Sequence, residues 1–288
     1  MSEEPYDTVT YKARQREQWS NAAEGWRRRW AAFERGAQPL SDRMMALAHV
    51  AAGQRVLDVA TGIGEPAMTA ARLVGAGGAV VAVDQAPQML AVARERMDAA
   101  GLRQVQFIES DAECVSLPPD AFDAIVCRWG LMFFTDPDGS LARLRTSLVP
   151  GGWMVAAVWG PPQRVPLIAL PFAALAGAGE TPPPTPSGPS PFALSTPAAL
   201  ERVARLAGYT EIHSEPYTVT FDFPSVAELR GHLADVSSQV RVILATQTAE
   251  QQAAFWQRLA DAATRYAQPD GAIRLENECL IVAGRRPA

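Results

Sequence analysis

Short apolar segments that alternate with helical segments constrain the fold of this chain more than any other feature of the sequence. Between residues 55 and 159 we predict strand 55–60, helix 66–74, strand 79–84, helix 86–100, strands 105–110 and 122–129, helix 137–148 and strand 153–159. Strands that alternate with helices of this length require a parallel sheet with right-handed crossovers. The sequence therefore predicts a doubly wound α/β fold.

Helical segments flank this region. Residues 11–35 predict an amphipathic helix, because apolar residues recur at steps of three and four. A second helix is expected over 39–51. The stretch 181–191 is rich in proline and predicts a loop. Beyond it we expect helix 197–207, strand 217–223, two or three helices within 225–267 and strand 276–285.

These elements suggest four parts. They are an N-terminal helical cap over 1–48, a Rossmann-like core over 49–160, a Pro-rich insertion or lid over 161–196, and the C-terminal part of the core over 197–288. The last part contains a helical insertion over 225–268.

The composition excludes several classes of protein. A formal net charge of −5 in 288 residues argues against a nucleic-acid partner. The most apolar run, 165–179, is too short to span a membrane, and the N-terminus shows no signal segment. Cys114, Cys127 and Cys279 are too scattered for a disulfide framework or a metal site. We expect a cytoplasmic protein with a small-molecule substrate and no bound metal; the oligomeric state stays open.

The stretch "VLDVATGIGEPA" (56–67) allows two interpretations. Gly62, Gly64 and Ala67 fit the dinucleotide fingerprint, and Asp84 follows at the distance of a ribose-binding acid. However, Asp58 ends the first strand, so its carboxylate is expected close to the bound group. Beside a pyrophosphate, like charges ~5 Å apart cost a few kcal/mol at an effective dielectric constant of about 20. A ligand that carries an ammonium and a sulfonium reverses the sign of that interaction.

Acids at the ends of the next two strands favour the cationic ligand. Asp84 ends the second strand, where its carboxylate can accept both ribose hydroxyls. Asp111 follows the third strand and can accept from an adenine amino group, while the backbone of Ala112 pairs with the ring. Three acids on successive strand ends predict a cationic nucleoside as the ligand.

Five segments together resemble the successive motifs of class I S-adenosylmethionine-dependent methyltransferases: "VLDVATGIGEPA", "VVAVDQAPQML", "FIESDAECVSLP", "FDAIVCRWGLMFF" and "LVPGGWMVAAVW". The likeness covers about residues 50–160 and is greatest to small-molecule enzymes similar to the ubiquinone/menaquinone-biosynthesis methyltransferases. It implies a mostly parallel seven-stranded sheet with an antiparallel last strand, and S-adenosylmethionine as cofactor. Ala60 is a departure, since many members have glycine there.

The resemblance also implies which residues bind the cofactor. The Gly62–Gly64 loop is expected under the methionine part, Asp84 at the ribose, and Asp111 with Ala112 at the adenine. The complete expected set is Asp58, Ala60, Thr61, Gly62, Gly64, Asp84, Gln85, Met89, Asp111, Ala112 and Arg128. Arg128 is a candidate for the cofactor carboxylate.

The methyl acceptor is less constrained. We expect transfer to carbon or oxygen of a small apolar or aromatic metabolite. His232 is a candidate base, although a packed or surface histidine is the favoured alternative. Trp26 and Trp129 are candidates for substrate contact. Two alternative functions stay open: a protein or cyclase that binds the cofactor without methyl transfer, and an NAD(P)-dependent oxidoreductase.

Overall fold

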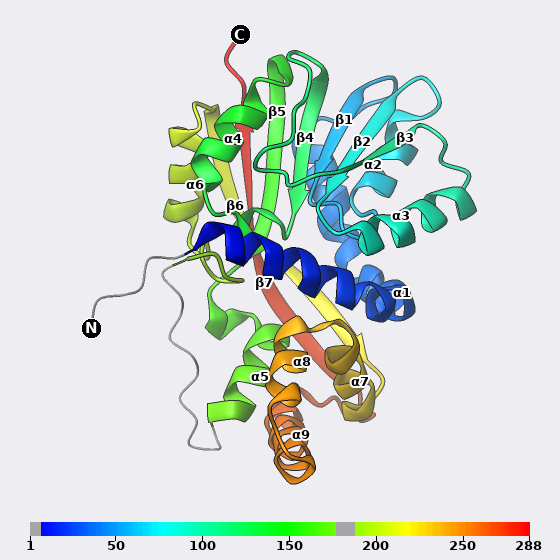
Figure 1. Ribbon diagram of the computed structural model, residues 1–288, viewed down its shortest axis with the longest axis vertical. Helices are drawn as coiled ribbons and strands as arrows, with labels where there is room; N and C mark the ends of the chain where they lie inside the picture. The colour runs from blue at the N-terminus through cyan, green and yellow to red at the C-terminus, as the bar shows by residue number, and fades with distance from the viewer. Residues whose placement is uncertain (1–6, 177–187) are drawn as a thin grey trace.

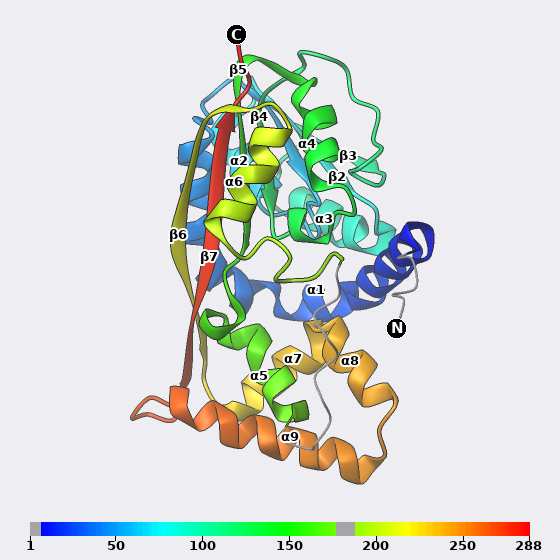
Figure 2. The ribbon, with the colours of Figure 1, turned by 90° about the vertical axis from the view of Figure 1, so that its left-hand side faces the viewer.

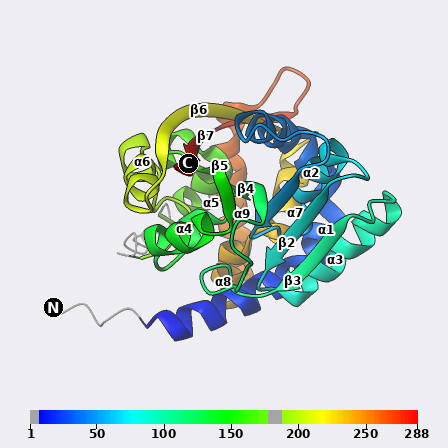
Figure 3. The same cartoon turned by 90° about the horizontal axis from the view of Figure 1, so that it is seen from above.

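The strands form one seven-stranded sheet in the order β3-β2-β1-β4-β5-β7-β6 (Figures 1 and 3). The computed structural model describes residues 7–176 and 188–288. Its strands are β1 (Arg55–Val59), β2 (Ala79–Asp84), β3 (Val105–Glu109), β4 (Phe122–Arg128), β5 (Leu148–Trp159), β6 (Thr210–Phe223) and β7 (Ile273–Arg285). Strands β1 to β5 are parallel, and β7 is antiparallel to both of its neighbours. The predicted sheet with an antiparallel last strand is confirmed.

Helices flank both sides of the sheet (Figure 2). They are α1 (Thr8–Leu47), α2 (Ala67–Val74), α3 (Pro87–Ala99), α4 (Pro137–Arg145), α5 (Pro166–Ala176), α6 (Pro197–Leu206), α7 (Val226–Val236), α8 (Ser238–Ala245) and α9 (Ala249–Ala263). Strands β6 and β7 extend past the others, and α5, α7, α8 and α9 gather around their far end (Figures 1 and 2). Within residues 7–176 and 188–288, no helix combines the length and the apolarity that a membrane crossing requires.

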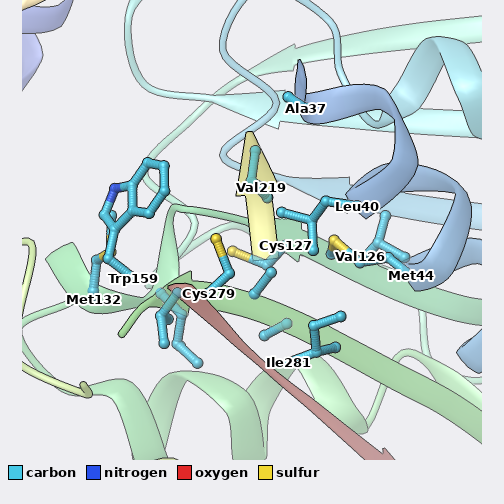
Figure 4. Close-up of a cluster of buried hydrophobic side chains, with 14 of the residues drawn as sticks. Ala37, Leu40, Met44, Val126, Cys127, Met132, Trp159, Val219, Cys279 and Ile281 are labelled. Carbon is cyan, nitrogen blue, oxygen red and sulfur yellow. The ribbon is translucent and has the colours of Figure 1, made fainter. Parts of the chain in front are cut away.

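The two N-terminal helices expected from the sequence are one continuous helix, α1, with Pro39 inside it. A proline within a helix removes one backbone hydrogen bond and normally bends the axis. Figure 2 shows α1 changing direction along its length. Burial of Ala37, Leu40 and Met44 against the sheet stabilises the helix across the proline, so the expected break at 35–39 was wrong (Figure 4).

Other boundaries also differ from the predictions. The expected turn at 150–152 lies inside β5, where the register with β4 shifts between the pairs Phe122–Leu148 and Ala124–Trp153. Strand β6 begins at Thr210, seven residues earlier than expected, because it pairs along nearly the whole of β7. The loop predicted over 181–191 lies partly outside the described residues, and its described part, 188–191, is neither helix nor strand.

The core lies between the sheet and its helices. Figure 4 shows part of it, where Val126 and Cys127 of β4 and Cys279 of β7 lie near Leu40 and Met44 of α1. Because the central parallel strands are covered on both sides, they read as continuous apolar runs. The first half of α1 crosses below the ends of β4, β1 and β2 (Figure 1).

Candidate functional site

A cavity lies at the carboxyl edge of the sheet, between the ends of β1 to β4 and helix α1. In open α/β sheets, ligands bind at this edge. Its lining comprises Tyr11, Lys12, Gln15, Trp19, Trp26, Phe33, Ala60, Thr61, Gly62, Ile63, Glu65, Asp84, Gln85, Met89, Ser110, Asp111, Ala112, Glu113, Arg128, Trp129, Gly130, Phe133 and Phe134. Most of the expected cofactor residues and both expected substrate tryptophans therefore line one cavity, whereas Asp58, Gly64 and His232 do not.

The two glycines after β1 serve different purposes. Gly62 has a positive φ of 56°, lines the cavity, and a Cβ built on it would meet nothing within 4 Å. Gly64 has φ 99°, and a Cβ there would come within 3.2 Å of Ala93 and Met97 on α3. Gly62 thus leaves room for a ligand, while Gly64 allows close packing against α3. Contact of Gly64 with the ligand stays a prediction.

Asp58 points into the protein interior rather than into the cavity. Its side chain is fully buried; Oδ2 accepts hydrogen bonds from Thr61 Oγ1 at 2.6 Å and from the backbone N–H of Ala67 at 2.8 Å. Burial raises the pKa of Asp58 to about 7. In this structure the carboxyl group joins the loop to the start of α2, and direct contact of Asp58 with the ligand stays a prediction.

Asp84 lines the cavity and also accepts hydrogen bonds from two backbone N–H groups. Its Oδ2 accepts from the N–H of Gly62 at 2.8 Å, and its Oδ1 accepts from the N–H of Ala86 at 2.9 Å. Burial raises the pKa of this carboxyl group. Gln85 and Met89, which follow it, also line the cavity. The carboxylate thus fixes the Gly62 loop at the place where a ribose is expected.

Asp111 and Ala112 lie at the β3 end of the cavity, near the first turns of α1. Lys12 of α1 makes ion pairs with Asp111 at 2.7 Å and with Glu113 at 2.6 Å. Glu113 accepts hydrogen bonds from Lys12, Thr135 and the Asp136 N–H. These bonds hold the pKa of its carboxyl group below the usual range despite partial burial. Helix α1 is thereby joined to the expected adenine end. Lys12 was not predicted, and a lysine on an exposed helical turn gives no local signal of such a contact.

Arg128 lines the cavity while its guanidinium is held by α1. Nη1 donates to Glu34 Oε1 at 2.6 Å and to Ser41 Oγ at 2.8 Å, and Nη2 donates to Glu34 Oε2 at 2.9 Å. All three side chains are buried. Contact of Arg128 with a cofactor carboxylate stays a prediction.

Aromatic rings form the remaining wall. Phe33 of α1 makes edge contacts with Trp26 at 4.9 Å and with Trp129 at 5.4 Å between ring centroids. Trp129, at the end of β4, stacks on Trp159 of β5 at 4.4 Å. Trp19 and Phe133 complete the wall with an edge contact at 5.9 Å. This surface suits an apolar or aromatic ligand, and it can also face a cation.

His232 lies behind this wall. The imidazole is buried, stacked on Phe33 at 5.9 Å and tilted against Phe223 at 5.2 Å. Burial and the nearby Arg29 together lower its pKa to about 4, against a smaller opposing effect of Asp235. Helix α7 packs His232 into an aromatic cluster outside the cavity lining, and its role as a base stays a prediction that this position does not favour.

Comparison with known proteins adds independent information. Residues 56–152 match a family model described as a methyltransferase domain. The chain is 39% identical over 122 residues to the demethylmenaquinone methyltransferase of Thermus thermophilus; the match covers 42% of this chain and 54% of that protein. The chain spans about half the length of the curated relatives it matches.

Solved structures share the fold. The YcgJ protein of Bacillus subtilis superposes with a TM-score of 0.56 and 19% identity, covering 86% of this chain and 98% of that one. The [4+2]-cyclase SpnF superposes with a TM-score of 0.54 and 20% identity, covering 88% of this chain and 81% of that one. At these identities the likeness concerns the fold alone.

The fold and the position of the cavity define a Rossmann-like domain with a ligand cavity at the carboxyl edge of its sheet. Residues 56–152 are a methyltransferase domain, similar to those of the ubiquinone/menaquinone methyltransferases.

Proposed function

We propose that this chain transfers a methyl group from S-adenosylmethionine to carbon or oxygen of a small apolar or aromatic metabolite. The observation that carries the proposal is one cavity that joins the Gly62 loop, Asp84 and Asp111 to an aromatic wall. A relative named as a demethylmenaquinone methyltransferase favours a quinone-type acceptor.

The residues present fit the cofactor. The open space beside Gly62 admits a nucleoside close to the backbone, as it would not with a larger residue there. Asp84 would receive the ribose, and Asp111 with Ala112 the adenine. Both described cations on the cavity wall, Lys12 and Arg128, are engaged in ion pairs with Asp111 and Glu34.

The chain would assist the transfer mainly through its shape. The cofactor supplies a methyl group on a positively charged sulfur, and the reaction consumes that charge. Trp26, Trp129 and Phe33 would exclude water and hold a flat acceptor beside the methyl group. Their ring faces also attract the cationic centre before transfer.

We propose the same four parts as the sequence suggested: a cap over 1–48, the core over 49–160, an insertion over 161–196 and the C-terminal part over 197–288. The ion pairs of Lys12 and Arg128 with residues of the cap or core support a cap that closes the cavity from α1.

Thermal unfolding tests the cofactor. A ligand that binds only the folded protein raises the midpoint by mass action. We expect S-adenosylhomocysteine to raise the midpoint and NADH to leave it unchanged. Stabilisation by NADH alone would contradict the proposal.

Transfer itself requires a second assay. Methyl-labelled S-adenosylmethionine would be incubated with the protein and an extract of apolar metabolites, with heat-inactivated protein as the control. We expect a labelled, extractable product. Binding without any labelled product would favour the non-methylating alternative, which deserves the test because the cyclase SpnF has the same fold.

A further inference from the structure

Phe33 is the ring at which the cavity and a second, fully buried group of rings meet. Its side chain is buried and forms part of the cavity wall. Two of its ring contacts, Trp26 and Trp129, also line the cavity. Two others, Phe221 at 4.6 Å and His232 at 5.9 Å between ring centroids, do not. The cavity therefore ends at Phe33 in this direction.

Helix α1 is held against its neighbours on either side of Phe33. A Cβ on Gly25 would overlap the carbonyl oxygen of Asp235, at the end of α7. A Cβ on Gly36 would overlap the carbonyl oxygen of Thr220, in β6. Because the backbones approach this closely at both glycines, α1 has no free space in which to shift towards α7 or β6. The Phe33 ring is thus a fixed part of the wall.

Phe33 lies far from the expected adenine end of the cavity. Positions 12 and 33 belong to one stretch of α1 without proline, and at 1.5 Å per residue they are roughly 30 Å apart along the axis. Between Lys12 and Phe33, the same helix lines the cavity with Gln15, Trp19 and Trp26. A nucleoside at the Lys12 end therefore leaves the Phe33 end to the methyl acceptor.

The surface that this end presents to a ligand is apolar. Phe33 has no polar side-chain atom, and the indole nitrogens of Trp26 and Trp129 are themselves buried, so the two tryptophans face the cavity with ring carbons. A hydroxyl group turned towards these rings would lose its hydrogen bonds to water without replacement, which is unfavourable.

The nearest polar group behind Phe33 is the imidazole of His232. It is buried and neutral near pH 7, so one ring nitrogen can donate a hydrogen bond and the other can accept one. Among the residues that the structure describes, neither nitrogen has a partner. Unpartnered buried polar groups are rare and costly. Since Phe33 contacts both the cavity and this imidazole, removal of its ring would bring the two nitrogens to the cavity wall.

We infer that Phe33 is a specificity-determining residue, which closes the acceptor end of the cavity over His232 and so selects a flat aromatic acceptor whose far end carries no polar group. This inference rests on the proposed function, since it takes the acceptor to lie beyond the nucleoside in the same cavity. It adds a property of the acceptor that the aromatic wall alone does not define, namely which end of the molecule bears its oxygen atoms.

Two probes that differ by one hydroxyl group test the closed end. 2-Naphthol has a hydroxyl at one end of a flat pair of rings, and 2,6-dihydroxynaphthalene has a further hydroxyl at the opposite end. Calorimetry on the full chain with S-adenosylhomocysteine in excess would give the dissociation constant of each probe. For the wild type we expect 2-naphthol to bind about tenfold more tightly than the diol, because one hydroxyl of the diol must face Phe33.

Variants at position 33 separate closure of the cavity from packing. Phe33→Ala should shift the ratio of the two dissociation constants about tenfold in favour of the diol, since the His232 nitrogens can then bind its second hydroxyl. Addition of His232→Phe to Phe33→Ala should abolish this shift. Phe33→Leu keeps an apolar side chain over His232 and should keep the wild-type order of the probes.

Phe221→Leu is the matched control. Phe221 stacks on Phe33 but does not line the cavity, so this variant loosens the packing behind the wall without changing the wall itself. We expect the ratio of the two dissociation constants to stay at its wild-type value. A shift as large as that of Phe33→Ala would refute the inference, because loosened packing would then explain the change.

The remaining outcomes distinguish the two levels of the proposal. If the wild type does not bind S-adenosylhomocysteine, the proposed function fails and the inference fails with it. If S-adenosylhomocysteine binds, but the wild type binds neither probe or binds the diol as tightly as 2-naphthol, the role of Phe33 is refuted while the cofactor site stands. The comparison of the two probes on the wild type needs no variant, so it decides the inference even if Phe33→Ala does not fold.

Discussion

The guanidinium of Arg128, at the end of β4, is held by both carboxylate oxygens of Glu34, in the middle of α1, at 2.6 and 2.9 Å. The pair joins the wall of the cavity to the helix that covers it. Both side chains are buried, so the two groups depend on each other for their charge compensation.

Removal of Glu34 should therefore destabilise the protein strongly. Glu34→Ala leaves Arg128 buried without its carboxylate, and we expect a loss of about 3–5 kcal/mol in the free energy of unfolding in urea. Glu24→Ala is the control, because Glu24 lies on the same helix but makes only exposed ion pairs, with Arg27 and Arg28. That variant should lose less than about 1 kcal/mol. Equal losses would show that the buried pair is no stronger than a surface one.

The glycines of the loop should respond differently to alanine. Gly64→Ala brings a Cβ within 3.2 Å of α3 at a positive φ, so we expect a loss of about 1–3 kcal/mol in stability. Gly62→Ala places its Cβ in open space that faces the cavity. We expect Gly62→Ala to reduce the free energy of unfolding by about 1 kcal/mol. We also expect it to weaken the binding of S-adenosylhomocysteine more than Gly64→Ala does, when the two variants are compared at the same folded fraction. Calorimetric titration and urea unfolding of both variants would check the contrast, and the reverse order would contradict it.

Asp58 should make stability fall as the pH rises. Its folded-state pKa is raised from 3.8 to about 7, so the folded state binds more protons than the unfolded state between these values. The contribution is complete below about pH 3.8 and is lost as the pH approaches about 7, with a slope of up to about 1.4 kcal/mol per pH unit. Asp58→Asn should remove this slope. Urea unfolding of both proteins between pH 4 and 8 measures the difference, and parallel curves would argue against a raised pKa.

His232 should have the opposite pH dependence. Its pKa is lowered from 6.5 to about 4, so its contribution is present above about pH 6.5 and lost as the pH falls towards about 4. His232→Phe should flatten the loss of stability over this range, since the neighbouring rings of Phe33 and Phe223 would accept another aromatic side chain. The charged groups nearest to it, Arg29 and Asp235, stay in place in the variant. If the variant lost as much stability as the wild type between about pH 6.5 and 4, protonation of His232 would not be what limits stability at acid pH.

The sheet and most of its helices could be predicted from the sequence, because apolar runs and glycine or proline boundaries are local signals. The strand ends that carry Asp84 and Asp111 were placed correctly at one edge. The continuous helix α1 could not be predicted, since its passage through Pro39 depends on burial of Ala37 and Leu40 against distant strands.

The direction in which each carboxylate points could not be predicted from the sequence either. Strand β1 is buried on both faces, so its residues show no alternation that says which way Asp58 points. Glu65 was overlooked for a related reason: its place on the cavity wall and its ion pair with Arg96 exist only once the loop after β1 and helix α3 have been brought together.

The sequence by itself determined the alternation of strands and helices, and with it the edge of the sheet at which a ligand binds, because both follow from local hydrophobic periodicity and from the handedness of crossovers. Only the tertiary structure decided which acids line the cavity at that edge and which are turned inward. Burial and charge pairing are properties of the whole packed chain, and α1 contributes to both from a position far away in the sequence.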